Sequence, residues 1–455
     1  MKIRTCIVFL SILIILLAGS CSKPPPGDID RPYEELGEEL VKFLVSEDYP
    51  SAVKKFDSVM KIALPAKKLK AAWKEQEKQF GKFISIEGVE KKPFKKYMIV
   101  AVKTKFQKTS GETTYLDVRL TYTAKKQVAG LFFVPSSGPK DFEELEYINR
   151  DSFSEEEITF GFTGWELPGV LTIPKDGAKF SVVILVHGSG PNDKDETIGP
   201  NKPFKDIAWG LATKGIAVFR YDKRTLVHGG KLTKVIHEFT VMEETVLDVV
   251  EAVKVLKEHD KIDPENIFIL GHSLGGMMIP KISEITNIPK GYIIMAGTIR
   301  KIEDILIEQV EYISLLDGEI DATEKVGIQK TKDQIKEIKE IQKTKKTKSP
   351  QIILGASNKY WIHFDDYDIC KSAKAIHKPV YIIQGERDYQ VTMKDFQLWK
   401  DCLKGMENFS YKSYPGLNHL FIFGKEKSTP EEYSKVGHVQ EVLIEDLSDW
   451  IKSQK

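Results

Sequence analysis

The chain has 455 residues, enough for two or three domains that each bury a core. Its 67 lysines and arginines nearly balance 66 aspartates and glutamates, so the net charge of +1 gives no reason to expect a nucleic-acid partner. Four cysteines, two of them within the first 21 residues, exclude a disulfide framework and a Cys-x-x-Cys metal site. Whether Cys370 and Cys402 pair stays open.

The N-terminus has the pattern of a secretory signal peptide over residues 1–20, with basic residues followed by an apolar run and small residues. Because the run ends in Gly19-Ser20-Cys21, it resembles a bacterial lipobox, which implies cleavage before Cys21 and lipidation of its thiol. We therefore expect an extracytoplasmic protein tethered to the membrane by lipid, with residues 21–32 as a proline-rich linker. The alternatives are ordinary signal cleavage and an uncleaved anchor helix.

Residues 33–138 are predicted to form a small α+β domain. Apolar residues keep helical spacing from Glu34 to Phe80, and the period changes to two between Phe83 and Val134. This part contains no histidine and no cysteine, so we expect no chemistry in it. The acidic residues 139–157 are expected to form a second linker or a joining helix.

Strands alternate with helices from residue 158 to the C-terminus, which predicts an α/β domain with a mostly parallel sheet. Strands are predicted at 158–163, 170–173, 181–187, 216–221, 266–270, 291–296, 380–383 and 409–414. Helices are expected at 204–214, 241–259, 394–404 and 439–451. Residues 298–376 interrupt the alternation. Within them, isoleucines at 328, 335, 338 and 341 predict one amphipathic helix.

The apolar strand before Gly271-His-Ser-Leu-Gly275 makes this stretch a candidate nucleophile elbow. In such a turn Ser273 would stand between strand and helix in a strained conformation, next to the positive end of the helix. The alternative is a glycine-rich turn that carries a serine without a chemical role.

Four segments together resemble the α/β-hydrolase superfamily: His187-Gly-Ser-Gly190, the elbow, Gly385-Glu-Arg-Asp388 and Asn418-His419. The whole chain is similar to secreted bacterial lipoprotein esterases in which a small N-terminal α+β domain precedes the hydrolase. The resemblance implies an α/β-hydrolase domain over residues 158–455, with residues 298–376 as a cap over Ser273.

In this superfamily the acid and then the histidine follow the serine along the chain. Asp388 lies just after a predicted strand, where the family acid is expected, and Glu386 is its rival. His419 follows the last strand, where the family base lies, and His438 is the second choice. The resemblance thus implies a triad of Ser273, Asp388 and His419.

The tetrahedral intermediate of acyl transfer needs hydrogen-bond donors for its oxyanion, and backbone N–H groups serve this purpose. The N–H groups of Leu274 and Ser189 are the expected donors. His187 and His272 are expected to support the structure, and Asp222 to form a structural ion pair. Tyr360, Trp361 and Phe364 are expected either in an acyl pocket or in the core. Histidine spacing predicts no metal site, and no phosphate loop or cofactor motif occurs.

The sequence therefore predicts a serine carboxylesterase that acts on a small-molecule ester through an acyl-enzyme. The alternatives on the same fold are a serine peptidase or amide hydrolase and an acyltransferase. A non-enzymatic alternative is a surface binding protein with a passive hydrolase scaffold. The natural substrate and the oligomeric state are not encoded in any recognisable motif.

Overall fold

The computed structural model describes residues 31–94, 97–109, 111, 113–136, 145–345 and 351–454. The chain divides into two compact units between residues 139 and 140. The expected signal peptide and the lipidation site Cys21 lie outside the described residues. No helix in the described ranges combines the length and hydrophobicity needed to cross a bilayer.

The N-terminal unit packs four helices on a four-stranded antiparallel sheet in the order β1-β2-β3-β4. Its elements are α1 (Tyr33–Val45), α2 (Tyr49–Lys54), α3 (Ser58–Ala63), α4 (Ala66–Phe80), β1 (Lys82–Phe94), β2 (Tyr97–Gln107), β3 (Thr113–Tyr122) and β4 (Val128–Ser136). Asp48 and Asp57 cap α2 and α3 by accepting backbone N–H groups. Leu40 and Trp73 from the helices share a buried core with Phe106 from the sheet. The predicted α+β domain is confirmed.

The second unit contains an eight-stranded sheet. Its strands are β5 (Phe153–Phe160), β6 (Leu167–Pro174), β7 (Phe180–Val186), β8 (Ala217–Tyr221), β9 (Ile262–His272), β10 (Gly291–Met295), β13 (Val380–Gly385) and β14 (Phe409–Tyr414). The helices around it are η1 (Arg150–Ser152), α5 (Pro203–Thr213), α6 (Arg224–Val227), α7 (Gly229–Val235), η2 (Met242–Val246), α8 (Leu247–Lys257), α9 (Leu274–Ile285), α14 (Met393–Cys402), η3 (Pro430–Ser434) and α15 (Glu441–Ser453).

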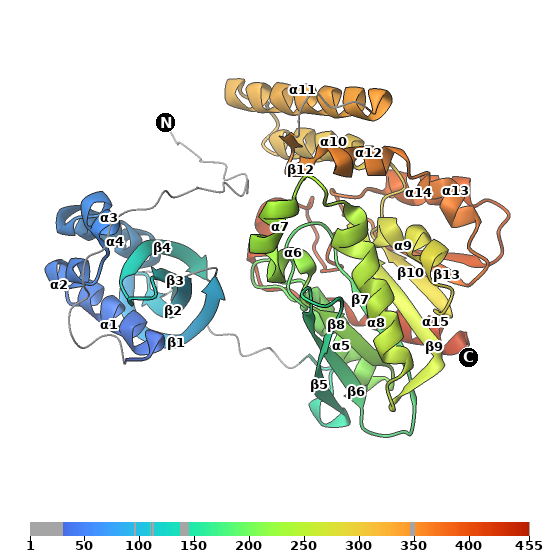
Figure 1. The fold of residues 1–455 in the computed structure, drawn as a ribbon, viewed down its shortest axis with the longest axis horizontal. Coiled ribbons are helices and arrows are strands. Elements are labelled where there is room, and N and C mark those ends of the chain that lie inside the picture. Colours follow the sequence, from blue (N-terminus) through green and yellow to red (C-terminus); the bar gives the residue numbers. More distant parts are fainter. Residues whose placement is uncertain are drawn as a thin grey trace. The chain divides into compact units, whose positions relative to one another are not determined.

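The sheet has the order β14-β13-β10-β9-β7-β8-β6-β5, and its strands are parallel from β14 to β8. β6 and β5 are antiparallel and close one edge. Helices α8, α9 and α14 cover one face, and α5 and α15 cover the other (Figure 1). This order confirms the predicted α/β-hydrolase architecture. The elbow strand β9 lies near the centre, so its carboxyl end is flanked by the ends of several other strands.

Among the elements whose bounds differ from the prediction, the first strand and the helix before the elbow strand differ in kind as well. The first strand of this sheet begins at Phe153, within a stretch for which the sequence predicted a linker or a joining helix. Its residues Glu155 to Glu157 lie on an edge strand that solvent reaches, which explains why an acidic stretch can form a strand here. The helix expected over 241–259 starts with one π-helical turn, η2, before α8. Such turns widen a helix locally and redirect its side chains.

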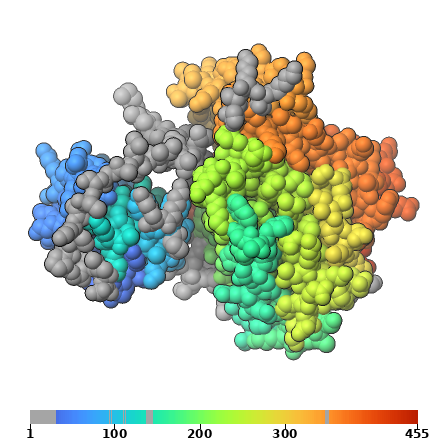
Figure 2. Space-filling model, in the orientation of Figure 1, coloured from blue at the N-terminus to red at the C-terminus, as the bar shows by residue number. Residues whose placement is uncertain are grey.

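The insertion after β10 forms a cap whose helices α10 to α12 lie at the top of the view in Figure 1, and its atoms are orange in Figure 2. It contains α10 (Ile302–Ser314), α11 (Ala322–Thr344), β11 (Ile352–Ile353), β12 (Ala356–Ser357), α12 (Asn358–Asp365) and α13 (Ile369–Lys374). Helix α11 begins with a capping box at Asp321 and buries the four predicted isoleucines. The amphipathic helix expected in the cap is therefore confirmed.

A disulfide joins Cys370 of α13 to Cys402 of α14 across 32 residues of chain. Since closing a loop of this length in the unfolded chain removes entropy, the bond should stabilise the fold by about 3–4 kcal/mol. We expect the Cys370→Ser/Cys402→Ser double variant to lose that free energy of unfolding in urea titrations. Reduction of the wild-type protein should give the same loss, and equal stability with and without the bond would contradict the prediction.

Candidate active site

Ser273 lies at the end of β9 in a backbone conformation that non-glycine residues rarely adopt, with φ 53° and ψ −115°. Its N–H donates to the carbonyl oxygen of Met295 on β10, and its own carbonyl accepts from Met277 in the first turn of α9. Gly275 allows this close turn, because a Cβ there would lie 2.3 Å from the carbonyl oxygen of Val186. This strained strand-to-helix turn is the geometry of a nucleophile elbow.

Asp388 and His419 come together as an acid–base pair. The Nδ1 atom of His419 lies 2.6 Å from Oδ2 of Asp388, and both side chains are buried. The second carboxylate oxygen of Asp388 accepts the N–H groups of Gln390 and Val391 at 2.8 and 3.0 Å. Gln384 donates to Oδ2 at 3.0 Å. The aspartate is thereby held as an acceptor that directs the imidazole.

The rival residues have other partners. Glu386 is exposed and accepts a hydrogen bond from the Ser413 hydroxyl. His438 lies just before α15 and faces the Asp206 carboxylate at 3.3 Å. These partners, Ser413 and Asp206, are not part of the Asp388–His419 pair.

The ring of His272, the residue before Ser273, lies against the ring of His419, with centroids 4.6 Å apart. Nε2 of His272 lies 2.9 Å from the backbone oxygen of His419, and Nδ1 lies 2.8 Å from a carboxylate oxygen of Glu196. As the sequence predicts, His272 therefore points into supporting structure. It connects the turn at Ser273 to the loop that carries His419.

The two expected oxyanion donors are the backbone N–H groups of Leu274 and Ser189. Leu274 is the first residue of α9, and its N–H has no acceptor among the residues that the structure describes. Ser189 is exposed in the loop after β7, and within the same residues its N–H is also without an acceptor. The hydrogen-bonding capacity of both N–H groups is therefore not used by the described part of the chain, as the role of an oxyanion donor requires.

His187 starts the same loop and is fully buried. Its Nε2 lies 3.0 Å from the backbone oxygen of Asp193, and its ring packs against those of Phe204 and Tyr221. Burial lowers the pKa of His187 to about 4, so its ring is neutral at physiological pH. This matches the supporting role predicted for it.

His272 and Glu196 form a buried ion pair. Burial opposes the charge on His272, but the adjacent Glu196 carboxylate outweighs burial and raises the pKa of the imidazole above its ordinary value. Burial likewise opposes the charge on Glu196, yet His272 and the N–H of Gly188 lower the pKa of that carboxyl. The pair therefore stabilises the fold most between pH 4.5 and pH 6.5, the ordinary pKa values of a glutamate and a histidine.

We expect Glu196→Gln to lower the free energy of unfolding by about 3 kcal/mol at pH 5.5, because it leaves a buried charge without its partner. The difference from wild type should shrink as the pH rises above 6.5 through the raised pKa of His272. It should also shrink below pH 4.5, where falling pH protonates the carboxyl. Urea titrations of both proteins from pH 4 to 9 measure this profile. A difference that stays constant with pH would show that the pair does not carry the effect.

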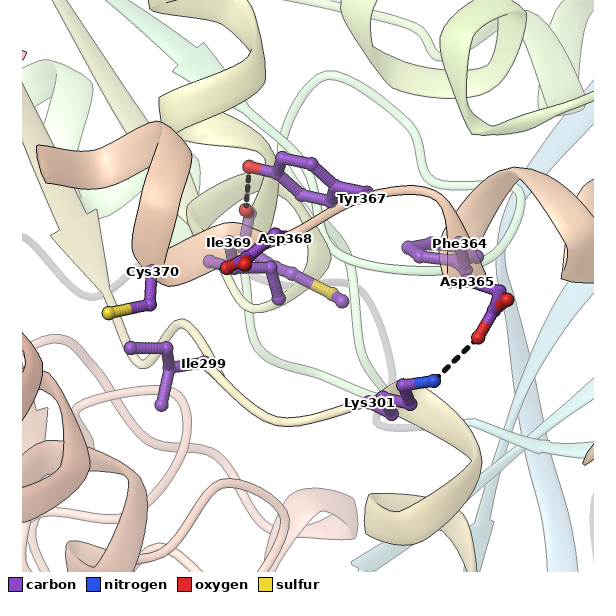
Figure 3. Close-up of a pocket in the computed structure, with 9 residues that line it drawn as sticks. Ile299, Lys301, Phe364, Asp365, Tyr367, Asp368, Ile369 and Cys370 are labelled. Atoms are coloured by element: carbon purple, nitrogen blue, oxygen red, sulfur yellow. Dashed lines mark hydrogen bonds and ion pairs between the residues drawn. The ribbon is translucent and has the colours of Figure 1, made fainter. Parts of the chain in front are cut away.

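Helix α9 borders a cavity of about 310 Å³ (Figure 3). Met277, Ile299, Phe364 and Ile369 give it apolar walls, and the ion pair of Lys301 with Asp365 lies at one side. The lining also includes Tyr367, Asp368 and Cys370. Met277 is one helical turn from Ser273, but Ser273 itself does not line this space.

Tyr367 enters the same region from the cap and inserts its hydroxyl into the hydrogen-bond ladder of α9. The hydroxyl accepts the N–H of Lys281 and donates to the carbonyl of Met277, both at 3.1 Å. These two backbone groups would normally bond to each other, and Pro280 disturbs the helix at this turn. The cap thus stabilises the helix that follows Ser273.

Tyr360, Trp361 and Phe364 were expected either in an acyl pocket or in the core. Tyr360 and Trp361 are buried, and their polar atoms bind Glu244 and the carbonyl of Ile353. Phe364 is buried in the core and also lines the cavity.

Asp222 accepts the backbone N–H of Lys194 and lies 3.9 Å from its ammonium, which agrees with the structural ion pair expected for it. Among the described residues, no group of three histidine, cysteine or acidic side chains could hold a metal ion.

Sequence reasoning missed three residues that contact the site: Glu196, Lys223 and Gln384. Lys223 donates to the carbonyl of Gly188 at 2.7 Å, while Glu196 accepts the N–H of the same residue. A charged residue in a loop normally indicates solvent exposure. No local pattern distinguishes these buried charges from the surface residues around them.

Two family models match the chain. The model described as "Serine aminopeptidase, S33" matches residues 178–426, and "Protein of unknown function (DUF3887)" matches residues 37–131. Esterase EstD of Thermotoga maritima is 38% identical over 412 residues, which cover 90% of this chain and 93% of that protein.

Solved structures with a similar fold include Est1E from Butyrivibrio proteoclasticus, at 15% identity and a TM-score of 0.43 over 66% of this chain and 98% of that one. Another is the Pyrococcus furiosus esterase Pf2001, at 16% identity and a TM-score of 0.41 over 66% and 92%. The family match and the strand order agree with the resemblance inferred from the four sequence motifs. The chain belongs to the α/β-hydrolases of the serine aminopeptidase S33 family and carries a DUF3887 domain before its hydrolase domain.

Proposed function

We propose that this hydrolase is a serine carboxylesterase that works through an acyl-enzyme. The observation that carries the proposal is the 2.6 Å contact between His419 and Asp388, in which His419 also packs against His272, the residue before Ser273. A serine hydroxyl needs a base that is itself oriented by a carboxylate, and these three residues supply the required chemical groups. The similarity to Esterase EstD supports an ester as the substrate.

In the proposed reaction the Oγ atom of Ser273 attacks the ester carbonyl carbon while Nε2 of His419 takes the hydroxyl proton. The carbonyl oxygen becomes an oxyanion that accepts the N–H groups of Ser189 and Leu274. His419 then gives the proton to the departing alcohol, which leaves an acyl group on Ser273. Water repeats the sequence with the same base and releases the carboxylic acid.

A serine peptidase is the second candidate, because the family model carries the description of an aminopeptidase. Amide hydrolysis would use the same residues, but His419 would protonate an amine as the leaving group. An acyltransferase differs only in the final acceptor, which replaces water. A binding protein without activity would have no use for the oriented acid–base pair.

The decisive experiment is rapid mixing of the purified protein with p-nitrophenyl esters of increasing chain length. We expect a burst of about one equivalent of nitrophenol, followed by steady turnover, and an acyl group on the peptide that contains Ser273. A matched series of aminoacyl p-nitroanilides tests the peptidase. Faster turnover of the anilides would reverse the order of the two candidates, and no reaction with either series would favour the binding protein.

We infer further that the chain is exported and attached to the membrane through a lipid on Cys21. Support comes from the Cys370–Cys402 disulfide, since such bonds persist mainly in oxidising compartments outside the cytoplasm. Expression in bacteria with labelled palmitate should label the wild-type chain, and Cys21→Ala should lose the label and leave the membrane fraction. A Cys6→Ala control should keep both. Unlabelled wild-type protein would contradict the inference.

A further inference from the structure

Gly188, the first glycine of the loop after β7, lies directly against Ser273. A Cβ on Gly188 would lie 3.1 Å from the Cβ of Ser273 and 3.6 Å from its Oγ. The peptide group that joins Gly188 to Ser189 is therefore next to the proposed nucleophile. Its orientation decides which of its two polar atoms a substrate oxygen meets.

Two side chains hold the carbonyl end of this peptide group. The ammonium of Lys223 donates to the Gly188 carbonyl at 2.7 Å, and the side-chain amide of Asn192 donates to it at 3.2 Å. No cis peptide bond occurs in the described chain, and in a trans peptide the C=O and N–H bonds point in opposite directions. Holding the Gly188 carbonyl therefore directs the Ser189 N–H away from Lys223 and leaves it available as a donor.

Lys223 is buried and is fixed by a second contact. Its ammonium lies 2.6 Å from a carboxylate oxygen of Glu244, and the side chain is only 2% exposed. Glu244 belongs to the π-helical turn η2, and its other oxygen accepts the hydroxyl of Tyr360 from the cap helix α12 at 2.7 Å. A buried ammonium needs such a partner, because an unpaired charge in the protein interior is costly.

The opposite charge fixes the preceding peptide group. Glu196 accepts the N–H of Gly188 at 2.7 Å, so the carboxylate of Glu196 and the ammonium of Lys223 hold consecutive peptide groups of the loop. A flip of the Gly188–Ser189 peptide would place a carbonyl oxygen where the oxyanion forms and would break both contacts to the Gly188 oxygen.

We propose that Lys223, assisted by Asn192, is a positioning residue that orients the Ser189 N–H toward the oxyanion, and that Glu244 and Tyr360 connect this lysine to the cap. The inference rests on the proposed serine mechanism. It assigns no contact between Lys223 and the substrate, so Lys223 acts only through the peptide group that it holds.

The test compares an ester with the matching thionoester, in which sulfur replaces the carbonyl oxygen and accepts hydrogen bonds poorly. The variant is Lys223→Met/Glu244→Gln, which removes both buried charges together and avoids leaving one unpaired. We expect ester kcat to fall about 100-fold with KM nearly unchanged, because one oxyanion donor is lost. Thionoester turnover should fall less than about tenfold, so the ratio of ester turnover to thionoester turnover should decrease.

The matched control is Arg224→Met/Asp248→Asn, which removes a neighbouring buried ion pair that does not touch the loop. It should lower the melting temperature by a similar amount and leave the ester-to-thionoester ratio at its wild-type value. A merely structural role for Lys223 predicts the same unchanged ratio in both double variants. That result would overturn the inference.

If the Lys223 double variant does not fold, Asn192→Ala takes its place, because Asn192 is only partly buried and donates to the same carbonyl. The inference then requires an ester-specific loss of about threefold or more, and an unchanged ratio would contradict it. Ser273→Ala separates this inference from the proposed function. If Ser273→Ala kept full activity, both the proposed function and the positioning role of Lys223 would be wrong. If Ser273→Ala lost its activity but the loop variants kept the wild-type ester-to-thionoester ratio, only the positioning role would be wrong.

Discussion

Replacing Ser273 with alanine should abolish ester hydrolysis, lowering kcat by about 10⁵-fold or more. The hydroxyl is the atom that forms the acyl bond, and the remaining oxyanion donors can only assist attack by water. Alanine has the same backbone restrictions as serine, so the φ of 53° at this position stays equally strained and the fold should be retained. Hydrolysis of p-nitrophenyl butyrate, with circular dichroism to verify folding, measures the effect.

Ser283→Ala is the matched control, because Ser283 lies on the same helix and its hydroxyl donates to the carbonyl of Pro280, away from the proposed site. This variant should keep its activity within about twofold. Equal activity of Ser273→Ala and wild type would show that the strained turn does not carry the nucleophile. The Asp388–His419 pair would then need another nucleophile, and the mechanism proposed above would be wrong.

Asp388→Asn should lower kcat by about 10³- to 10⁴-fold while the protein stays folded. With Oδ2 as acceptor, Asp388 keeps the proton of His419 on Nδ1 and leaves Nε2 free to accept the serine proton. An asparagine that presents its amide N–H at this position favours the opposite tautomer, in which Nε2 is already protonated. Its amide would also face Gln384, whose side chain is fixed by bonds to Gly385 and Val391 as well as to Asp388.

The effect is measured as kcat for an activated ester between pH 6 and 9. Glu386→Gln is the control, because Glu386 is the neighbouring acid in sequence but is exposed and bound to Ser413. It should retain activity within about twofold. The reverse result, a large loss in Glu386→Gln and a small one in Asp388→Asn, would move the role of the acid to Glu386.

The candidate triad could be predicted because each member lies in a local pattern to which the resemblance to the α/β-hydrolases assigns a role. Ser273 comes after an apolar strand and between glycines, while Asp388 and His419 each follow a strand within a few residues. Parallel strands end at the same edge of a sheet, so residues just after them come together whatever the helices between them do. The acid–base contact that the structure contains is the consequence of this rule.

Local patterns were misleading where burial comes from distant parts of the chain. The acidic run at 155–157 indicates a linker, yet Glu155 accepts hydrogen bonds from Arg220 and Trp209, which lie 65 and 54 residues further along. Likewise Glu244 occupies a π-helical turn in a segment whose apolar spacing predicted a continuous α-helix. A short window of sequence contains no information about such partners.

The α/β architecture and the small α+β domain before it could be predicted because strand and helix periodicity are encoded locally, and the resemblance to the α/β-hydrolases then indicated the three candidate catalytic side chains. The contacts that support the site could not be predicted in this way, because they join residues far apart in the chain. Glu196 meets His272 across 76 residues, Lys223 meets Gly188 across 35, and Cys370 meets Cys402 across 32. These contacts depend on which loops the completed sheet brings together, and burial there gives ordinary charged residues and cysteines a function that their neighbours in sequence do not reveal.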